Sequence, residues 1–271
     1  MARGQRELVA LAAVPLLAAT IVFLPPWAFL AVIAGAAALA CDELLSMARG
    51  IGLAARRVTP ILLLLALLAA AWVFGVGGLG VAVIAVVVIL PTLRIADKQA
   101  PSGSLGGAAA EIFAVLYLGA TAACLGWIRL WPVHPQGVKL LVFFLFCIWV
   151  GDSGAYYLGR RFGRHKMAPR ISTNKTLEGL AGGVLATFAA AALGAWALGL
   201  GLAPLHVAAL AALLAAAAPV GDLVESLFKR DSGVKDSSSL LPGHGGFLDR
   251  TDSLFYAAPF VIAYLAVTGL L

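Results

Sequence analysis

Charged residues are scarce in this sequence. Only 12% of the 271 residues are Asp, Glu, Lys or Arg, whereas about a quarter of a typical soluble protein is charged. Hydrophobic residues make up 62%, and the mean hydropathy is +1.00. These values exclude a water-soluble globular protein. Apolar runs of roughly 20 residues, each long enough to cross a hydrocarbon core about 30 Å thick, instead predict a multi-pass membrane protein.

Two further shortages exclude other classes of protein. The three cysteines (Cys41, Cys124 and Cys147) lie in or beside apolar runs without CxxC spacing, which argues against a disulfide framework or a zinc site. The sequence has no Walker A loop, so an ATPase has little support. The net charge of +6 is compatible with nucleic-acid binding, but the basic residues are spread between the apolar runs. We therefore expect no nucleic-acid partner and interpret these residues as determinants of membrane orientation.

Nine apolar runs can be delimited along the chain. They are too long and continuous for barrel strands of about 10 residues, so each is predicted to be a helix. The runs cover residues 8–24, 27–47, 58–75, 79–93, 108–130, 138–158, 180–200, 205–223 and 254–271. The predicted fold is therefore all-α, with about nine transmembrane helices. A Pro-Ser-Gly-Ser linker at 101–104 divides the chain into N-terminal membrane helices (1–107) and a C-terminal catalytic membrane region (108–271).

The distribution of basic residues predicts the orientation. If the N-terminus is cytoplasmic and the helices alternate, 17 of the 19 Lys and Arg residues fall on the cytoplasmic side, and only Arg129 and Lys139 lie opposite. Cytoplasmic segments of membrane proteins are enriched in Lys and Arg. The longest loops, 159–179 and 224–253, fall on the same side. We therefore predict a cell-membrane protein with a cytoplasmic N-terminus and a site that faces the cytoplasm.

Acidic residues concentrate in the second half of the chain. Eight of the 13 lie from Asp152 onward, near predicted cytoplasmic helix ends. Carboxylates near hydrocarbon are costly unless they are paired, bind a metal or face a wet cavity. Helix capping or pairing with arginine explains any single one of them, but not the whole cluster. One helical stripe is predicted to carry four polar residues at i, i+3, i+4 and i+7, namely Asp222, Glu225, Ser226 and Lys229. Paired carboxylates of this kind can hold Mg²⁺.

A glycine-rich loop follows this stripe. Glycines at 243, 245 and 246 would let the backbone approach a ligand closely. Asp249 and Asp252 repeat the i, i+3 spacing if the last helix begins there. Taken alone, the glycines are explained by an ordinary turn and His244 by a hydrogen-bonded loop position.

These residues form a motif of about 27 positions. It reads Ser226-Leu-Phe-Lys229-Arg230, then Lys235-Asp236, then Pro242-Gly-His244-Gly-Gly-Phe-Leu-Asp249-Arg250-Thr-Asp252. It resembles the C-terminal motif of phosphatidate cytidylyltransferases, also called CDP-diacylglycerol synthases. Further agreement with the family pattern lies upstream, at Asp152-Ser153-Gly154-Ala155-Tyr156, at Gly159-Arg160 with Gly163, and at Ile171-Ser172 with Lys175-Thr176 and Glu178-Gly179. The resemblance is close over roughly residues 149–253 and extends to the N-terminal helices only in hydropathy.

One segment departs from the family pattern. Where the family usually has Ser-Pro followed by a lysine, this sequence has Ser172-Thr173-Asn174 before Lys175. One cation and a rigid proline are therefore missing. This difference bears on the nucleotide contact of the loop or on the choice of substrate.

The resemblance implies an enzyme that transfers a cytidylyl group from CTP to phosphatidic acid, giving CDP-diacylglycerol and pyrophosphate for phospholipid synthesis. The implied cofactor is Mg²⁺, with a second cation as an open alternative. Asp222 and Asp249 are expected to ligate the principal ion, and Glu225, Asp236 and Asp252 to lie around it or at the second cation. The implied partners are CTP, phosphatidic acid and the lipid bilayer, and a homodimer is a further alternative.

The remaining motif residues are given roles by the same resemblance. Phosphate contacts are expected from Lys229, Arg230, Lys235 and Arg250. His244 is expected to donate a hydrogen bond to a phosphate, because a lipid phosphate is already ionised near neutral pH and needs no strong base. Nucleotide contacts or support of the metal are expected from Lys175 and Glu178, at the start of the seventh predicted helix. Further ligand contacts are expected from Ser226, Gly245 and Gly246.

Three other functions are alternatives to this one. An ion-coupled transporter would place its polar residues near the membrane midplane and often shows inverted repeats, whereas these charges gather at one face. A cytidylyltransferase that acts on a different lipid phosphate, such as an ether lipid, is a second alternative. The sequence does not exclude it, because generic apolar residues determine the preference for a lipid chain. A CDP-alcohol phosphotransferase would need an Asp-Gly pair followed by Ala-Arg and spaced aspartates, which the sequence lacks.

Overall fold

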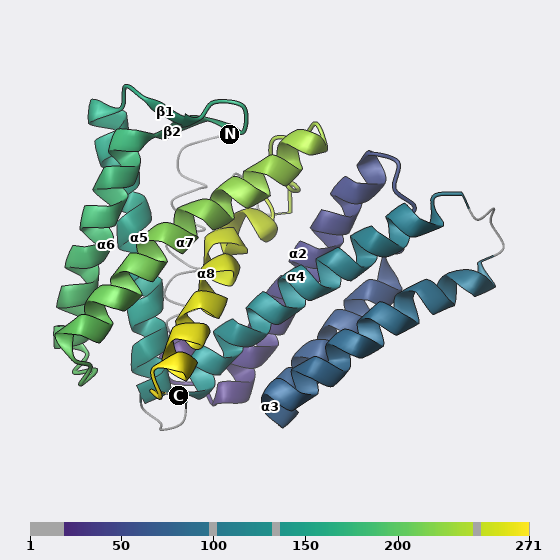
Figure 1. Cartoon of the computed structure of the whole chain (residues 1–271), viewed down its shortest axis with the longest axis horizontal. Coiled ribbons are helices and arrows are strands. Elements are labelled where there is room, and N and C mark those ends of the chain that lie inside the picture. The colour runs from purple at the N-terminus through teal and green to yellow at the C-terminus, as the bar shows by residue number, and fades with distance from the viewer. Residues whose placement is uncertain (1–18, 98–101, 132–135, 241–244, 271) are drawn as a thin grey trace. The chain divides into compact units, whose positions relative to one another are not determined.

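Long helices make up most of the structure. The computed structural model describes residues 19–97, 102–131, 136–240 and 245–270 (Figure 1). In this part of the chain, six helices are long and apolar enough to cross a membrane. They are α2 (Pro26–Gly50), α3 (Val58–Leu93, extended by the 3-10 turn η1, Arg94–Ala96), α4 (Ser104–Leu130), α5 (Gln136–Phe162), α6 (Leu177–Ala197) and α7 (Pro204–Asp231). A further helix, α8 (Leu248–Val267), carries the end of the motif. Because a helix pairs its own backbone groups, this is the arrangement that hydrocarbon requires, and the chain is a multi-pass helical membrane protein.

The long helix α3 is broken at Gly75. This residue has φ 64° and ψ −147°, which is not helical. A side chain added at Gly78 would collide with the Ala70 carbonyl, although the two residues would lie about 12 Å apart in a continuous helix. The chain therefore folds back at Gly75, and α3 contains two antiparallel arms. These arms coincide with the separately predicted runs 58–75 and 79–93.

Eight of the nine predicted runs coincide with helical segments of the structure, whereas most of the run 8–24 lies outside the described residues. The count of nine membrane crossings stays a prediction. The last run belongs to α8, which begins earlier than predicted, at Leu248.

The structure corrects the purely helical prediction in one place. The predicted loop 159–179 contains a small antiparallel hairpin, formed by β1 (Lys166–Ala168) and β2 (Ser172–Thr176). The helix α6 begins directly after it, because the Thr176 hydroxyl accepts a hydrogen bond from Gly179 N (3.1 Å) and caps the helix. Lys175 therefore lies on a strand, and its expected place at the start of a helix is wrong.

Small residues bring α5 and α6 close together, side by side in Figure 1. A side chain at Gly154 would collide with Ala186, and one at Gly182 would collide with Leu158. Glycine at such positions lets two helix backbones approach closely, as is common between membrane helices. This packing fixes the base of the β1–β2 hairpin, since both of its flanking helices are held.

The chain divides into two compact units. Unit 1 comprises residues 1–20, 24–126 and 228–251, and unit 2 comprises residues 21–23, 127–227 and 252–271. The predicted boundary between residues 107 and 108 stays a prediction. In unit 1, Glu111 of α4 is fully buried and accepts hydrogen bonds from Arg56 N and Arg94 Nη2, both at 2.6 Å. This pair ties α4 to η1 and to the segment that precedes α3.

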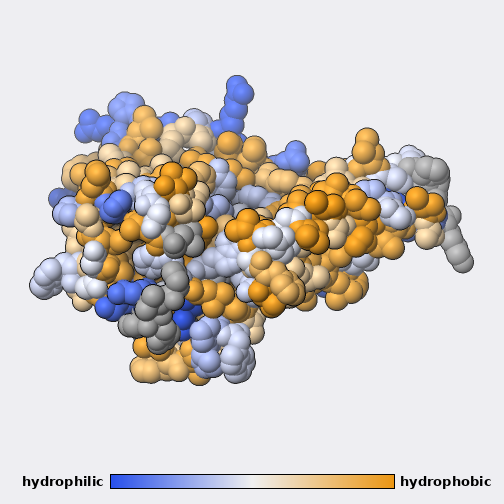
Figure 2. All heavy atoms as spheres, turned by 60° about the horizontal axis from the view of Figure 1, so that its bottom comes forward, coloured by the Kyte–Doolittle hydropathy of each residue, from blue (hydrophilic) through white to orange (hydrophobic). Residues whose placement is uncertain are grey.

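Apolar side chains cover much of the molecular face shown in Figure 2. Near the turn of α3, Val73, Phe74 and Val76 expose 71%, 73% and 75% of their surface. Exposed apolar surface on this scale is unfavourable in water. It is what contact with lipid chains requires.

Candidate functional site

Three carboxylates of unit 2 converge. Asp222 and Glu225 lie one turn apart on α7, and Asp252 lies in the first turns of α8. One ligand oxygen from each lies within 4.8 Å of the others, and Glu225 is buried while the two aspartates are partly exposed. In an octahedral Mg²⁺ site with bonds of about 2.1 Å, neighbouring ligand oxygens lie roughly 3 to 4 Å apart. Small side-chain movements would therefore let these three groups hold one Mg²⁺ ion.

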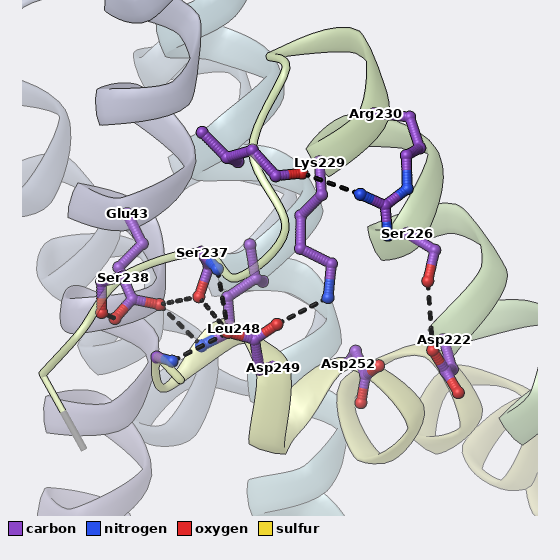
Figure 3. Close-up of polar contacts among 12 residues, drawn as sticks. Glu43, Asp222, Ser226, Lys229, Arg230, Ser237, Ser238, Leu248, Asp249 and Asp252 are labelled. Carbon is purple, nitrogen blue, oxygen red and sulfur yellow. Dashed lines mark hydrogen bonds and ion pairs between the residues drawn. The ribbon is translucent and has the colours of Figure 1, made fainter. Parts of the chain in front are cut away.

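A lysine from the β hairpin completes this carboxylate cluster. Lys175 Nζ lies 2.8 Å from Asp222 Oδ2 and donates to the Pro219 carbonyl at 3.4 Å. Pro219 has no N–H and interrupts the bonding of α7 one turn before Asp222. The second oxygen of Asp222 accepts a long hydrogen bond from Ser226 Oγ at 3.4 Å (Figure 3). The structure thus brings the predicted residues Lys175, Asp222 and Ser226 together.

Asp249 has different partners, all in unit 1 (Figure 3). Its Oδ1 lies 2.6 Å from Lys229 Nζ, and the two side chains are only 6% and 11% exposed. Its Oδ2 accepts hydrogen bonds from Ser237 N (2.9 Å) and Gly246 N (2.8 Å), and it lies 2.7 Å from Ser237 Oγ. Asp249 therefore anchors Lys229 and both ends of the segment 237–246.

Glu43 of α2 was missed by the sequence analysis. It is 7% exposed and has four polar contacts with residues about 200 positions later in the chain. It accepts hydrogen bonds from Ser238 Oγ (2.6 Å), Phe247 N (3.0 Å) and Leu248 N (2.8 Å), and it shares the Ser237 hydroxyl (2.9 Å) with Asp249. The available signal was an acid inside an apolar run, which is costly without partners.

The other predicted site residues are placed as follows. Glu178 accepts hydrogen bonds from Arg164 N (3.0 Å) and His165 N (3.2 Å), so it fastens the turn after α5. Arg230 donates to the Val234 carbonyl at 3.1 Å. The side chains of Lys235, Asp236 and Arg250 are exposed. Gly245 has φ 77°, and Gly246 is buried against Ser237 and Glu43. His244 lies outside the described residues.

Comparison with known proteins identifies relatives of this chain. Phosphatidate cytidylyltransferase of Haemophilus influenzae is 43% identical over 143 residues, covering 48% of this chain and 46% of that protein. The enzyme of that name from Synechocystis is 41% identical over 144 residues, covering 51% and 49%, and that from Bacillus subtilis is 38% identical over 141 residues, covering 52% of each. The matches span about half the length of these relatives. The profile of the cytidylyltransferase family matches residues 4–268, and the chain belongs to this family.

Proposed function

We propose that this protein transfers a cytidylyl group from CTP to phosphatidic acid and produces CDP-diacylglycerol and pyrophosphate. A phosphatidate oxygen forms a bond to the α-phosphorus of CTP, the bond from that phosphorus to the β-phosphate oxygen breaks, and pyrophosphate leaves. The convergence of Asp222, Glu225 and Asp252 on membrane helices carries the proposal. The names of the relatives support the same reaction.

The two reactants are polyanions, so the site must balance several negative charges. In phosphoryl transfer, positioning and electrostatic stabilisation supply most of the catalysis. Lys229 follows Glu225 by one turn of α7 and is held by Asp249. An ammonium group has three donors, so Lys229 can keep this ion pair while it contacts a phosphate oxygen. Arg230, Lys235 and Arg250 are proposed to bind the outer phosphates.

The carboxylates divide into two roles in this proposal. Asp222, Glu225 and Asp252 hold the divalent ion, which would neutralise charge on the phosphate oxygens when bound. Asp249, whose oxygens accept from Lys229, Ser237 and Gly246, fixes the lysine. Lys175 forms an ion pair with Asp222 and is proposed to contact the nucleotide. Mg²⁺ is the proposed ion because the ligand set consists of carboxylate oxygens.

A shallow, open apolar groove supports a lipid substrate. It follows one face of α4, in unit 1, and is lined by Ala109, Ile112, Phe113, Leu116 and Tyr117. Phe228 packs edge-on against Phe113 and Tyr117, with ring centroids 5.5 and 6.1 Å away. Lys229 is the next residue. We propose that an acyl chain lies in the groove while the phosphate of the same lipid reaches the cationic residues after Phe228.

Two wider features belong to this proposal. The site faces the cytoplasm, where CTP is made, in agreement with the predicted orientation of the basic residues. A homodimer is the proposed assembly. The family's usual proline and lysine are replaced at Thr173-Asn174, in the loop expected to contact the nucleotide. The preference for CTP over other nucleotides should therefore be measured.

The test is an assay of the purified protein in detergent with CTP, Mg²⁺ and phosphatidic acid, which measures pyrophosphate and the lipid product. We expect Asp222→Asn to lower kcat by about 100-fold or more and to weaken Mn²⁺ binding measured by electron paramagnetic resonance. Asp42→Asn is the control, because Asp42 is a partly exposed acid paired with Arg57 on the surface. Normal turnover and Mn²⁺ binding in Asp222→Asn would remove this residue from the site.

The same assay separates the alternatives. An ether-linked lipid phosphate and dCTP are run beside phosphatidic acid and CTP. A strong preference for either would redefine the substrate, whereas no pyrophosphate from any pair would contradict cytidylyl transfer and return the transporter to consideration.

A further inference from the structure

Glu43 lies at the N-terminus of α8, although it belongs to α2. The first N–H groups of a helix have no partner within the helix, and the helix dipole places partial positive charge there. Phe247 N and Leu248 N donate to the two oxygens of Glu43 at 3.0 and 2.8 Å. A carboxylate from a distant helix therefore fills a position that favours an anion.

The same carboxylate is linked to Asp249 through one hydroxyl. Ser237 Oγ lies 2.9 Å from Glu43 Oε2 and 2.7 Å from Asp249 Oδ2. Asp249 in turn holds Lys229. A side chain at Gly246 would collide with Ser237 Oγ and with both oxygens of Glu43. Only glycine at this position leaves room for the network.

We propose that Glu43 is a positioning residue, which fixes the first turn of α8 and, through Ser237, sets the orientation of Asp249 and its partner Lys229. This inference rests on the proposed function only for its effect on turnover. A carboxylate suits the position because Phe247 N, Leu248 N and Ser238 Oγ all donate to it, and the single proton of the Ser237 hydroxyl is shared between Glu43 and Asp249. An amide of the same shape would direct N–H groups at some of these donors and leave buried groups unsatisfied.

The first test compares two buried acids in unit 1. Glu43→Gln and Glu111→Gln each remove a buried carboxylate, but Glu111 contacts Arg56 and Arg94 and not the α8 terminus. Amide hydrogen exchange is measured on peptides that cover residues 245–251. We expect the exchange rate of these peptides to rise at least tenfold in Glu43→Gln and to match the wild type in Glu111→Gln. Both rates are first corrected for exchange that occurs through unfolding of the whole protein. Unchanged exchange in Glu43→Gln would overturn the positioning role.

The second test uses steady-state kinetics. We expect Glu43→Gln to lower kcat at least tenfold and to change the KM for phosphatidic acid by a smaller factor, because Lys229 is proposed to contact phosphate oxygens whose charge must be stabilised most in the transition state. Ser237→Ala keeps the two amide contacts of Glu43 and removes only the link to Asp249, so it should lower kcat without opening residues 245–251. Equal losses in Glu43→Gln and Glu111→Gln, in proportion to the folded fraction, would contradict the inference.

The two readouts separate the inference from the proposed function. If the wild type makes no CDP-lipid, the proposed function fails, and the exchange experiment still decides whether Glu43 fixes α8. If the wild type is active and exchange at 245–251 is insensitive to Glu43, the positioning role fails alone.

Discussion

Phe228 joins an apolar surface to a charged one. Its ring packs on Phe113 and Tyr117 in the α4 groove, and Lys229 and Arg230 follow it in the chain. An amphiphile with a phosphate head matches this change of polarity between neighbouring residues. We therefore expect the acyl-chain length of the substrate to affect binding through the groove, and the charge of its phosphate to affect binding through Lys229 and Arg230.

Filling the groove at Ala109 should separate these contributions. Ala109 is exposed on α4 and lines the groove. We expect Ala109→Trp to raise the KM for a long-chain phosphatidic acid by roughly tenfold, which is about 1.4 kcal/mol, and to leave the KM for a short-chain analogue unchanged. The control is Val73→Trp, at an exposed position on α3 outside the groove. Equal KM changes for both substrates would contradict an acyl-chain site.

Some residues of the candidate site could be predicted from the sequence, and others could not. Asp222, Glu225 and Asp252 were found because helical spacing predicts which acids share a face, and their convergence then required only that two helices meet. The position of Glu43 could not be predicted in this way, because no local sequence pattern indicates that α2 contacts the start of α8. The partners of Asp249 could not be predicted either, because Ser237 and Gly246 lie outside the long helices, where no periodicity relates them to Asp249.

At the scale of elements, hydropathy predicts the helices and the break in α3 but misses the β hairpin. The runs on both sides of Gly75 were delimited by composition alone, and the reversal depends on a backbone conformation that glycine readily adopts. The β1–β2 hairpin was missed because its strands are short and polar, so they lack the alternation that marks a half-buried strand. This error put Lys175 on a helix, where it would not point as it does toward Asp222.

Substitutions at two nearby glycines test the reversal in α3. Gly75→Ala should lower the free energy of unfolding by about 1–3 kcal/mol, because φ 64° with ψ −147° is strained for any residue with a Cβ. Gly77→Ala is the matched control: it is helical, and its added Cβ meets open space. Since alanine is favoured over glycine by up to about 1 kcal/mol in a helix, this variant should be neutral or more stable. Thermal unfolding in detergent measures the stability of both variants. Equal effects of the two substitutions would contradict the reversal of α3 at Gly75.

At the scale of the whole molecule, charge distribution predicts which side of the membrane each loop occupies. The three native cysteines are buried, with exposures of 0%, 9% and 0% for Cys41, Cys124 and Cys147. They should react slowly with a water-soluble maleimide. Single cysteines can therefore be introduced as reporters, at Ser239 in a predicted cytoplasmic loop and at Ala203 in a predicted external one, both exposed positions.

A membrane-impermeant maleimide should distinguish the two reporters. Because 17 of the 19 Lys and Arg residues fall on one side of the predicted topology and cytoplasmic segments retain such residues, Ser239→Cys should be labelled in inverted membrane vesicles and protected in right-side-out vesicles. Ala203→Cys should show the opposite pattern. Detergent-solubilised protein, in which both positions react, controls for reactivity. Labelling of both reporters in the same vesicles would place residues 203 and 239 on the same side of the membrane. It would contradict the predicted topology and the inference that CTP reaches the carboxylate cluster from the cytoplasm.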